Sequence, residues 1–282
     1  VHGHPPTAPY DRIILTAAGW DISPQWHHQL APDGMIIMPI VIQQEQFSVA
    51  LQKRGNTYTS KSMLRCRFMP MRGEQPGLSD AYTVTIRPQV EFRMNLSDSS
   101  TAPDEAKIRQ WLTSPVQDIK SGLKFTGDEV NNWMLVDLWA DAKKLNLCGL
   151  VAFGDEVMAK DVPYLDGSRR YYRHTRGLVA EDGMVLLMRP ARMKLPQDEE
   201  RRKRFPLWMR VYGTGGMRLA RAYRALLERW DTIGRPDHHK LWIRVMPIDA
   251  VIPPQPDTVV IKKRWTQLLI GWGLTGCNGG FC

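Results

Sequence analysis

The pattern of hydrophobic and polar positions over residues 1–75 predicts a strand, a helix, a second strand and a hairpin. An apolar run, 13–15, follows the polar pair Asp11-Arg12 and stops at small residues, as expected of a short buried strand that leads into a turn. The run 35–40 is apolar throughout, which is typical of a strand in a sheet covered on both faces. The predicted elements are strands at 12–15 and 35–40, a helix at 23–31 with Ser23 as N-cap and Pro24 in its first turn, a break at Pro32-Asp33-Gly34, and a hairpin of 47–53 and 58–68 around Arg54-Gly55-Asn56.

The pattern changes after a Gly- and Pro-containing stretch at 73–79, which predicts a linker. Strands and helices then follow without an internal repeat, so we expect two domains, residues 1–75 and 76–282, the second of α+β type. Its predicted elements are strands at 82–94, 148–153, 207–212, 241–248 and 258–272, a polar loop at 97–104, helices at 104–112, 128–145 and 217–230, and a strand pair within 177–188 that turns at Glu181-Asp182-Gly183.

Composition supports a globular chain with a basic second half. Of 282 residues, 43% are hydrophobic and 24% are charged, and the net charge is +9. Residues 1–79 carry 7 Lys/Arg against 5 Asp/Glu, whereas residues 80–282 carry 31 against 24. The basic excess favours an acidic partner or serves solubility alone. The run 201–204 behind the acidic run 198–200 fits a solvated segment or a docking site for an acidic peptide. Nucleic-acid binding is not expected, because no aromatic platform interleaves with this charge.

Other site classes have little support in the sequence. The cysteines are few and scattered, so we expect neither a disulfide framework nor a metal site; they are Cys66, Cys148, Cys277 and Cys282. Neighbouring His27 and His28 point different ways on a helix and make poor joint ligands. No apolar run reaches about 18 residues and no signal peptide is visible, so we expect no membrane contact and a cytoplasmic protein.

A candidate binding site lies where the first strand ends. Ligands of α/β sheets bind beyond the carboxyl ends of the strands, and small side chains there leave room for a ligand. Backbone N–H groups at such a turn, together with a hydroxyl group, can hold a carboxylate. The residues concerned are Thr16, Ala17, Ala18 and Gly19. The alternative is a tight turn whose small residues serve packing alone.

Several motifs in the first 75 residues, taken in order, resemble the carboxyl-terminal half of protein-L-isoaspartate O-methyltransferases. They are Gly3-His4 followed by Ala8-Pro9-Tyr10-Asp11-Arg12-Ile13-Ile14, the loop Thr16-Ala17-Ala18, Gln29-Leu30-Ala31-Pro32-Asp33-Gly34 with Asp33 in place of a glycine, the strand Met35 to Pro39, and Arg67-Phe68-Met69-Pro70-Met71-Arg72-Gly73. The resemblance implies an α/β fold, namely the carboxyl-terminal half of a class I (Rossmann-like) methyltransferase sheet, followed by the α+β accessory domain.

The same resemblance implies a reaction and its residues. The enzymes transfer a methyl group from S-adenosylmethionine to an Asp or isoAsp carboxylate, which is ionised at neutral pH because its pKa is about 4, so no general base is needed. Thr16 to Gly19 would hold that substrate carboxylate. Pro70 and Arg72 would close the pocket, with Arg72 pairing with a carboxylate, and His2, Gly3 and His4 would lie at the cofactor edge.

The cofactor motif of that family, a Gly-rich turn with a later acidic residue, does not precede Thr16 in this chain. The chain opens at Val1 without an initiator Met, so we expect a fragment of a longer enzyme that does not bind the cofactor by itself. The loop Gly213-Thr214-Gly215-Gly216 follows a predicted strand and opens a helix, yet no acidic residue lies at the end of a following strand about 20 positions later. We therefore interpret this loop as a connection.

Phrases in the second half resemble the extra carboxyl-terminal domain of isoaspartate-methyltransferase-like enzymes found beside lanthipeptide and FxLD-type peptide genes. They are Val136-Asp137-Leu138-Trp139-Ala140, Leu227-Glu228-Arg229-Trp230 with Gly234-Arg235-Pro236, and Val260-Ile261-Lys262-Lys263-Arg264 with Trp272. This resemblance implies methylation of an Asp in a ribosomal peptide, whose ester can collapse to a succinimide. The alternative hypothesis is a peptide-binding or scaffolding module without catalysis.

Overall fold

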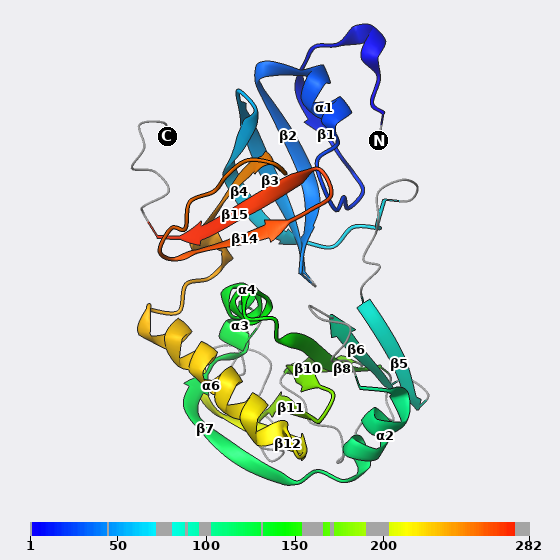
Figure 1. The fold of residues 1–282 in the computed structure, drawn as a ribbon, viewed down its shortest axis with the longest axis vertical. Helices are drawn as coiled ribbons and strands as arrows, with labels where there is room; N and C mark the ends of the chain where they lie inside the picture. The colour runs from blue at the N-terminus through cyan, green and yellow to red at the C-terminus, as the bar shows by residue number, and fades with distance from the viewer. Residues whose placement is uncertain are drawn as a thin grey trace. The chain divides into compact units, whose positions relative to one another are not determined.

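The computed structural model describes residues 2–43, 45–71, 81–87, 90–95, 103–130, 132–153, 166–169, 172–189 and 203–273. The chain divides into two compact units (Figure 1). Unit 1 comprises Val1–Ser79 and Pro236–Cys282, and unit 2 comprises Asp80–Arg235. The predicted linker at 73–79 and most of the predicted loop at 97–104 lie outside the described residues.

Unit 1 is built on a seven-stranded sheet in the order β1-β2-β3-β4-β13-β15-β14. The pair β1–β2 is parallel and the pairs β2–β3 and β3–β4 are antiparallel, as predicted for a strand–helix–strand unit followed by a hairpin. The pairs β4–β13, β13–β15 and β15–β14 are also antiparallel, but these strands were not predicted to join this sheet. The elements are η1 (Pro5–Thr7), β1 (Tyr10–Ile14), α1 (Pro24–Gln29), β2 (Leu30–Ile42), β3 (Glu45–Arg54), β4 (Thr57–Cys66), η4 (His238–Lys240), β13 (Leu241–Pro247), β14 (Thr258–Lys262) and β15 (Thr266–Trp272).

The start of α1 agrees with the prediction, whereas its end does not. The Ser23 hydroxyl accepts a hydrogen bond from the N–H of Gln25 at 3.3 Å, and proline occupies the first turn. The helix ends at Gln29 because Leu30 is already extended and begins β2. The predicted break at Pro32–Gly34 therefore lies inside β2, where the pairing with β1 is irregular between Tyr10 and Arg12.

The prediction that the first strand is buried is wrong. β1 lies at the edge of the sheet, and the side chain of Ile14 is 65% exposed. Its partner Ile37 on the same face is half-buried, whereas Ile36 and Met38 on the opposite face are fully buried. Only one face of the β1–β2 pair is therefore covered in this unit, although both were expected to be.

The hairpin β3–β4 agrees with the prediction. A two-residue turn at Gly55-Asn56 connects the strands, and Gly55 adopts a φ of 58° that favours glycine. Alternate side chains of β3 point into the core, where Phe47, Val49 and Leu51 are buried. Burial along β3 thus alternates with a period of two, as expected of a strand with one face against the core.

The end of the chain returns to unit 1, so residues 76–282 do not form one domain as predicted. Strand β13 pairs with β4, with Val245 opposite Tyr58, and the N–H of Ile243 donates to the Ser60 hydroxyl at 2.8 Å. This contact joins residues 183 positions apart, which no local pattern can report. The predicted strand at 258–272 is an antiparallel pair, β14 and β15, that turns at residues 263–265.

Unit 2 contains a second sheet, with the strand order β5-β6-β8-β10-β11-β12-β7 and β9 beside β10, all antiparallel. The predicted strand at 82–94 is the pair β5–β6, and β7 was not predicted. The strands are β5 (Ala81–Arg87), β6 (Val90–Asn95), β7 (Gln117–Phe125), β8 (Asn146–Phe153), β9 (Asp166–Arg169), β10 (Tyr172–Ala180), β11 (Gly183–Met188) and β12 (Phe205–Gly213). The turn between β10 and β11 is the predicted one.

The helices of unit 2 cover this sheet. They are α2 (Glu105–Thr113), α3 (Gly127–Val130), α4 (Met134–Ala142) and α6 (Gly216–Thr232). The predicted helix at 128–145 is two helices, α3 and α4; Trp133 precedes α4 with non-helical dihedrals, and the Asn132 side chain donates back to the Asp128 carbonyl at 3.0 Å. No helix among the described residues is long and apolar enough to cross a membrane.

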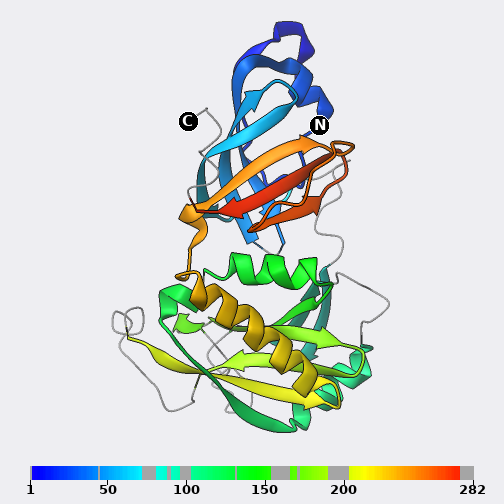
Figure 2. The same cartoon turned by 60° about the vertical axis from the view of Figure 1, so that its left-hand side comes forward.

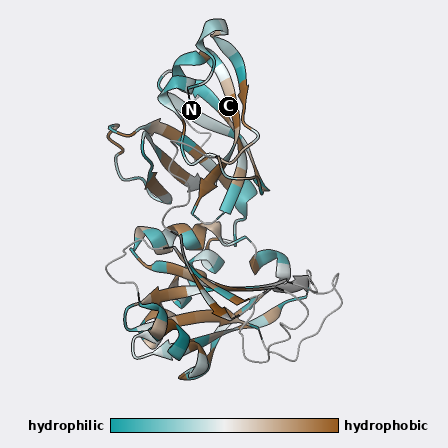
Figure 3. Ribbon diagram, turned by 90° about the vertical axis from the view of Figure 1, so that its right-hand side faces the viewer, coloured by the Kyte–Doolittle hydropathy of each residue, from teal (hydrophilic) through white to brown (hydrophobic). Residues whose placement is uncertain are grey.

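Helix α6 lies along β10, β11 and β12 with α4 beside it (Figure 2). Its buried side chains recur at helical spacing and include Leu219, Tyr223, Leu226 and Trp230. Hydrophobic residues lie mainly on the strands (Figure 3). An aromatic cluster continues this core, because the ring of Phe125 lies 5.0 Å from that of Trp133 and 5.9 Å from that of Trp230.

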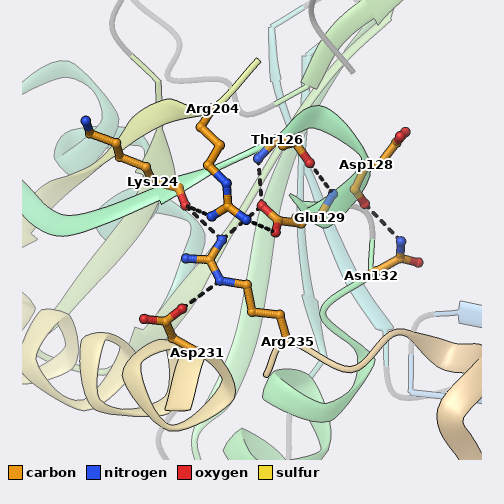
Figure 4. Close-up of polar contacts among 8 residues, drawn as sticks. All are labelled: Lys124, Thr126, Asp128, Glu129, Asn132, Arg204, Asp231 and Arg235. Atoms are coloured by element: carbon orange, nitrogen blue, oxygen red, sulfur yellow. Dashed lines mark hydrogen bonds and ion pairs between the residues drawn. The ribbon is translucent and has the colours of Figure 1, made fainter. Parts of the chain in front are cut away.

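Two ion-pair groups hold these helices in place. Arg176 of β10 binds the Asp137 carboxylate of α4 at 2.7 Å, and both side chains are largely buried. At the end of unit 2, Arg204 and Arg235 bind the same carboxylate, that of Glu129 in α3, at 3.0 Å each (Figure 4). The connection after α6 is therefore tied back to α3.

Candidate functional site

The backbone after β1 forms a loop, residues 16–21, that is held on two sides. The N–H of Ala18 donates to the Met69 carbonyl at 2.9 Å, and the N–H of Met71 donates to the Ala18 carbonyl at 2.8 Å. On the other side, Gly19 forms two similar backbone hydrogen bonds with β2, to Pro39 and from Val41. The predicted loop and the predicted closing segment around Pro70 are thus brought together by a backbone bridge.

Two N–H groups of this loop are left for a ligand. Thr16 is exposed and Ala17 is half-buried, and no hydrogen bond joins either N–H to a described residue. Such groups require water or a ligand as an acceptor. With the Thr16 hydroxyl beside them, these adjacent donors at the end of a strand can bind a carboxylate.

The structure places the predicted substrate residues as far as it describes them. Thr16, Ala17, Ala18 and Gly19 form the loop, and Pro70 lies opposite Ala18. Arg72, the predicted partner of a carboxylate, lies outside the described residues. The contact between the loop and the segment around Pro70 is thus made by Ala18 and Pro70, which both belong to the motifs quoted above.

The predicted cofactor residues lie elsewhere. The Gln29 side chain accepts from the N–H of His4 at 2.8 Å and donates to the His2 carbonyl at 2.7 Å. Gly3 lies against the same amide with a φ of 69°, and a Cβ there would approach Oε1 of Gln29 to 2.2 Å. The Tyr10 hydroxyl donates to the His4 carbonyl at 2.6 Å, which anchors this segment at the amino end of β1.

The amino and carboxyl ends of β1 are separated by about 13 Å, given about 3.3 Å per residue over a five-residue strand. His2, Gly3 and His4 are therefore not brought together with the loop. Gln29 was not among the predicted site residues, although it begins the motif at residues 29–34.

Asp21 was also missed, and its carboxylate is the most heavily hydrogen-bonded group near the loop. It accepts from the N–H of Trp265 at 2.6 Å, from the N–H of Thr266 at 3.3 Å and from the Thr266 hydroxyl at 2.5 Å. The N–H of Ile22 donates to its Oδ1 at 2.7 Å. A charged residue between two large apolar residues in the sequence, Trp20 and Ile22, was the available signal.

On α1, His27 packs against its surroundings, whereas His28 is exposed. The Nδ1 atom of His27 lies 2.9 Å from the Tyr58 hydroxyl, and Lys53 donates to the carbonyls of His27 and Leu30 at the end of α1. Burial, and then the charge of Lys53, lower the pKa of His27, and burial raises the pKa of Tyr58. Among the described residues, no three His, Cys, Asp or Glu side chains are placed to hold a metal ion.

The glycine loop 213–216 connects β12 to α6, as interpreted from the sequence. The N–H of Gly215 donates to the Asp182 carbonyl at 2.9 Å, and a Cβ on Gly215 would approach the Asp182 carboxylate to 2.2 Å. Arg218 pairs with the same carboxylate at 2.7 Å. An acidic side chain of the protein thus occupies the start of this helix, where a phosphate would otherwise bind.

Comparison with known proteins bears on residues 1–76. They match the family model described as "Protein-L-isoaspartate(D-aspartate) O-methyltransferase (PCMT)". This part of the chain is similar to protein-L-isoaspartate O-methyltransferases. The resemblance found in the motifs of residues 1–75 is thereby confirmed, whereas the association with lanthipeptides stays a prediction.

Curated relatives of that name match the same part of the chain. The protein of Dictyoglomus thermophilum is 37% identical over 67 residues, which are 24% of this chain and 30% of the relative. That of Hyperthermus butylicus is 40% identical over 73 residues, 26% of this chain and 30% of the relative. The chain spans about a third of the length of these relatives. A solved structure titled protein-L-isoaspartate O-methyltransferase aligns at 17% identity over 86% of this chain and 53% of its own, with a TM-score of 0.28.

Proposed function

We propose that the protein to which this chain belongs is an S-adenosylmethionine-dependent carboxyl O-methyltransferase that acts on isoAsp or Asp residues of a protein or peptide. In this proposal the chain provides the substrate side of the site. One observation carries it: the loop 16–19, which lies in the matched region, is bridged to the Pro70 segment, and no described residue accepts a hydrogen bond from the Thr16 and Ala17 N–H groups.

The proposed role of these residues is to hold and orient the substrate carboxylate. The two N–H groups and the Thr16 hydroxyl donate to its oxygens, and the buried Ala18 limits the size of the group that enters. Arg72 pairs with a carboxylate of the substrate, as the sequence predicted. The bound cofactor supplies the methyl group. No general base is required, because the carboxylate is ionised at neutral pH.

We further propose that the substrate is a ribosomal peptide and that unit 2 contributes to its recognition. The resemblance of 136–140 and 227–236 to lanthipeptide-associated enzymes supports this, as does the basic excess of residues 80–282. The second candidate, left open by the sequence, is a peptide-binding or scaffolding module without catalysis.

The test incubates the full-length parent protein with S-adenosylmethionine and three matched peptides that contain isoAsp, Asp or Asn at one position. Mass spectrometry should detect one added methyl group, or the net loss of one water that remains after the methyl ester expels methanol to form a succinimide, on the isoAsp or Asp peptide and neither on the Asn peptide. Thr16→Val should lower turnover about 10- to 100-fold, the effect of one hydrogen bond to a charged group, and Thr16→Ser should retain it. Peptide binding without methylation, while the cofactor is bound, would establish the second candidate.

A further inference from the structure

The turn between β14 and β15, residues 263–265, packs against the candidate loop. It belongs to the segment that returns to unit 1 after residue 236, outside the residues that match the methyltransferase family. Lys263 closes the turn by donating its N–H to the Thr266 carbonyl at 2.8 Å. Both ends of this turn contact the loop, each through a buried polar group.

The first contact is the Asp21 carboxylate, which is 1% exposed. Its Oδ2 atom accepts the two backbone N–H groups at the end of the turn, and its Oδ1 atom accepts the Thr266 hydroxyl. A buried carboxylate is stable only when its oxygens are satisfied. The backbone at residue 21 can therefore hardly move away from Thr266 without a large cost.

The second contact is Lys263, which is 7% exposed. Its Nζ atom lies 3.5 Å from the centre of the Trp20 ring and donates to the Val41 carbonyl at 3.0 Å. The N–H of Val41 in turn donates to the Gly19 carbonyl at 3.0 Å. Lys263 thus contacts Trp20, which follows Gly19, and Val41, the β2 residue whose N–H binds the Gly19 carbonyl.

We propose that Lys263 and Thr266 are positioning residues that hold the loop Thr16–Gly19 in one conformation through Trp20 and Asp21. The carboxyl-terminal segment is then part of the site rather than of a separate accessory domain. This inference rests on the proposed function, because the role given to residues 263–266 is to hold the N–H groups of Thr16 and Ala17 in place for the substrate. Its structural content can be tested independently.

The test measures amide hydrogen exchange in the 282-residue chain by NMR and uses a matched pair at one position. Thr266→Val keeps the shape of the side chain but removes the donor to Asp21, whereas Thr266→Ser keeps the donor. Exchange of the Ala18 and Gly19 amides should become about 10- to 100-fold faster in Thr266→Val, because a buried carboxylate oxygen loses a partner. It should stay near wild type in Thr266→Ser. The amides of β3 and β4 should not change in either variant.

Lys263→Met is a second variant, which keeps the aliphatic stem and removes the charge over Trp20. It should likewise accelerate exchange at Gly19 and leave β3 and β4 unchanged. Unchanged exchange at Ala18 and Gly19 in both variants would overturn the proposal, and so would equal acceleration throughout the sheet, since the contacts would then be part of global stability alone.

A parallel titration separates the two proposals. The isoAsp peptide is titrated into the same chain, with the Asn peptide as the control. If the loop responds in exchange but wild type binds neither peptide, the positioning inference is supported and the proposed function fails. If wild type binds the isoAsp peptide, Thr266→Val should weaken that binding about tenfold or more and Thr266→Ser should restore it; equal binding by all three would overturn the positioning role.

Discussion

Arg204 and Arg235 provide a controlled comparison of an exposed and a buried arginine, because they share two acceptors. Each binds the Glu129 carboxylate at 3.0 Å, and each donates to the Lys124 carbonyl, at 3.4 and 2.9 Å respectively (Figure 4). The side chain of Arg204 is 51% exposed and that of Arg235 is 14% exposed. Replacing each by alanine therefore compares an exposed with a largely buried arginine at the same two acceptors.

The expected costs differ by several kcal/mol. Arg204→Ala removes a solvent-screened pair and should cost about 0–1 kcal/mol of stability. Arg235 also binds Asp231 at 2.6 Å and stacks 4.9 Å from the ring of Phe125. Its removal leaves Glu129 largely buried with a weakened partner set, so Arg235→Ala should cost about 3–5 kcal/mol. Arg235→Lys keeps the charge but loses the planar fork, and should fall between them.

Native-state hydrogen exchange followed by mass spectrometry is the appropriate assay, because a chain of two units need not unfold in one step. The peptides that cover α3, α4 and α6 should exchange about 100- to 4,000-fold faster in Arg235→Ala and less than about tenfold faster in Arg204→Ala, at about 1.4 kcal/mol per tenfold. Equal effects of the two alanine variants would refute the argument that burial decides the strength of these pairs.

Three further predictions concern stability. Gly271→Ala should destabilise unit 1 by about 1–3 kcal/mol in thermal unfolding, because the new Cβ would approach the Trp242 ring to 2.3 Å; no loss would mean that the ring can move. Burial lowers the pKa of His27 in the folded state, so the folded chain binds fewer protons than the unfolded chain at a pH near that pKa. The free energy of unfolding is therefore highest above about pH 6.5 and falls as the pH is lowered. His27→Gln should reduce this pH dependence, measured as the urea midpoint at each pH. Asp137→Leu should cost about 3–5 kcal/mol by leaving Arg176 without its carboxylate, and the double variant with Arg176→Met should recover most of it in a denaturation cycle.

Local features of the fold could be predicted from the sequence. Ser23 and Pro24 predict the start of α1, and alternation with a Gly-Asn turn predicts the β3–β4 hairpin, because caps and turns depend on a few neighbouring residues. The same holds for the turn at Thr16–Gly19, which its small residues and its position after a strand predict; that this turn binds a ligand stays a prediction. These inferences use contacts within about ten residues.

Features that depend on distant residues could not be predicted in this way. Nothing near Lys263 in the sequence indicates Trp20 or Val41, and nothing near Thr266 indicates Asp21. The apolar run of β1 predicted burial, yet burial depends on what covers a strand and not on its own composition. His2, Gly3 and His4 were placed by sequence proximity to the motif, whereas Gln29 holds them at the other end of β1.

The pairing of β13 with β4 has a consequence for the order of folding. Unit 2 is an insertion between two neighbouring strands of one sheet, so that sheet is still incomplete when the ribosome has already synthesised all of unit 2. If unit 2 folds first, it shortens the chain that separates β4 from β13 and lowers the entropy lost on closing that loop. The contacts of Asp21 form only once residue 266 has emerged, so order in the candidate loop requires translation of the whole of unit 2 and of the segment that follows it.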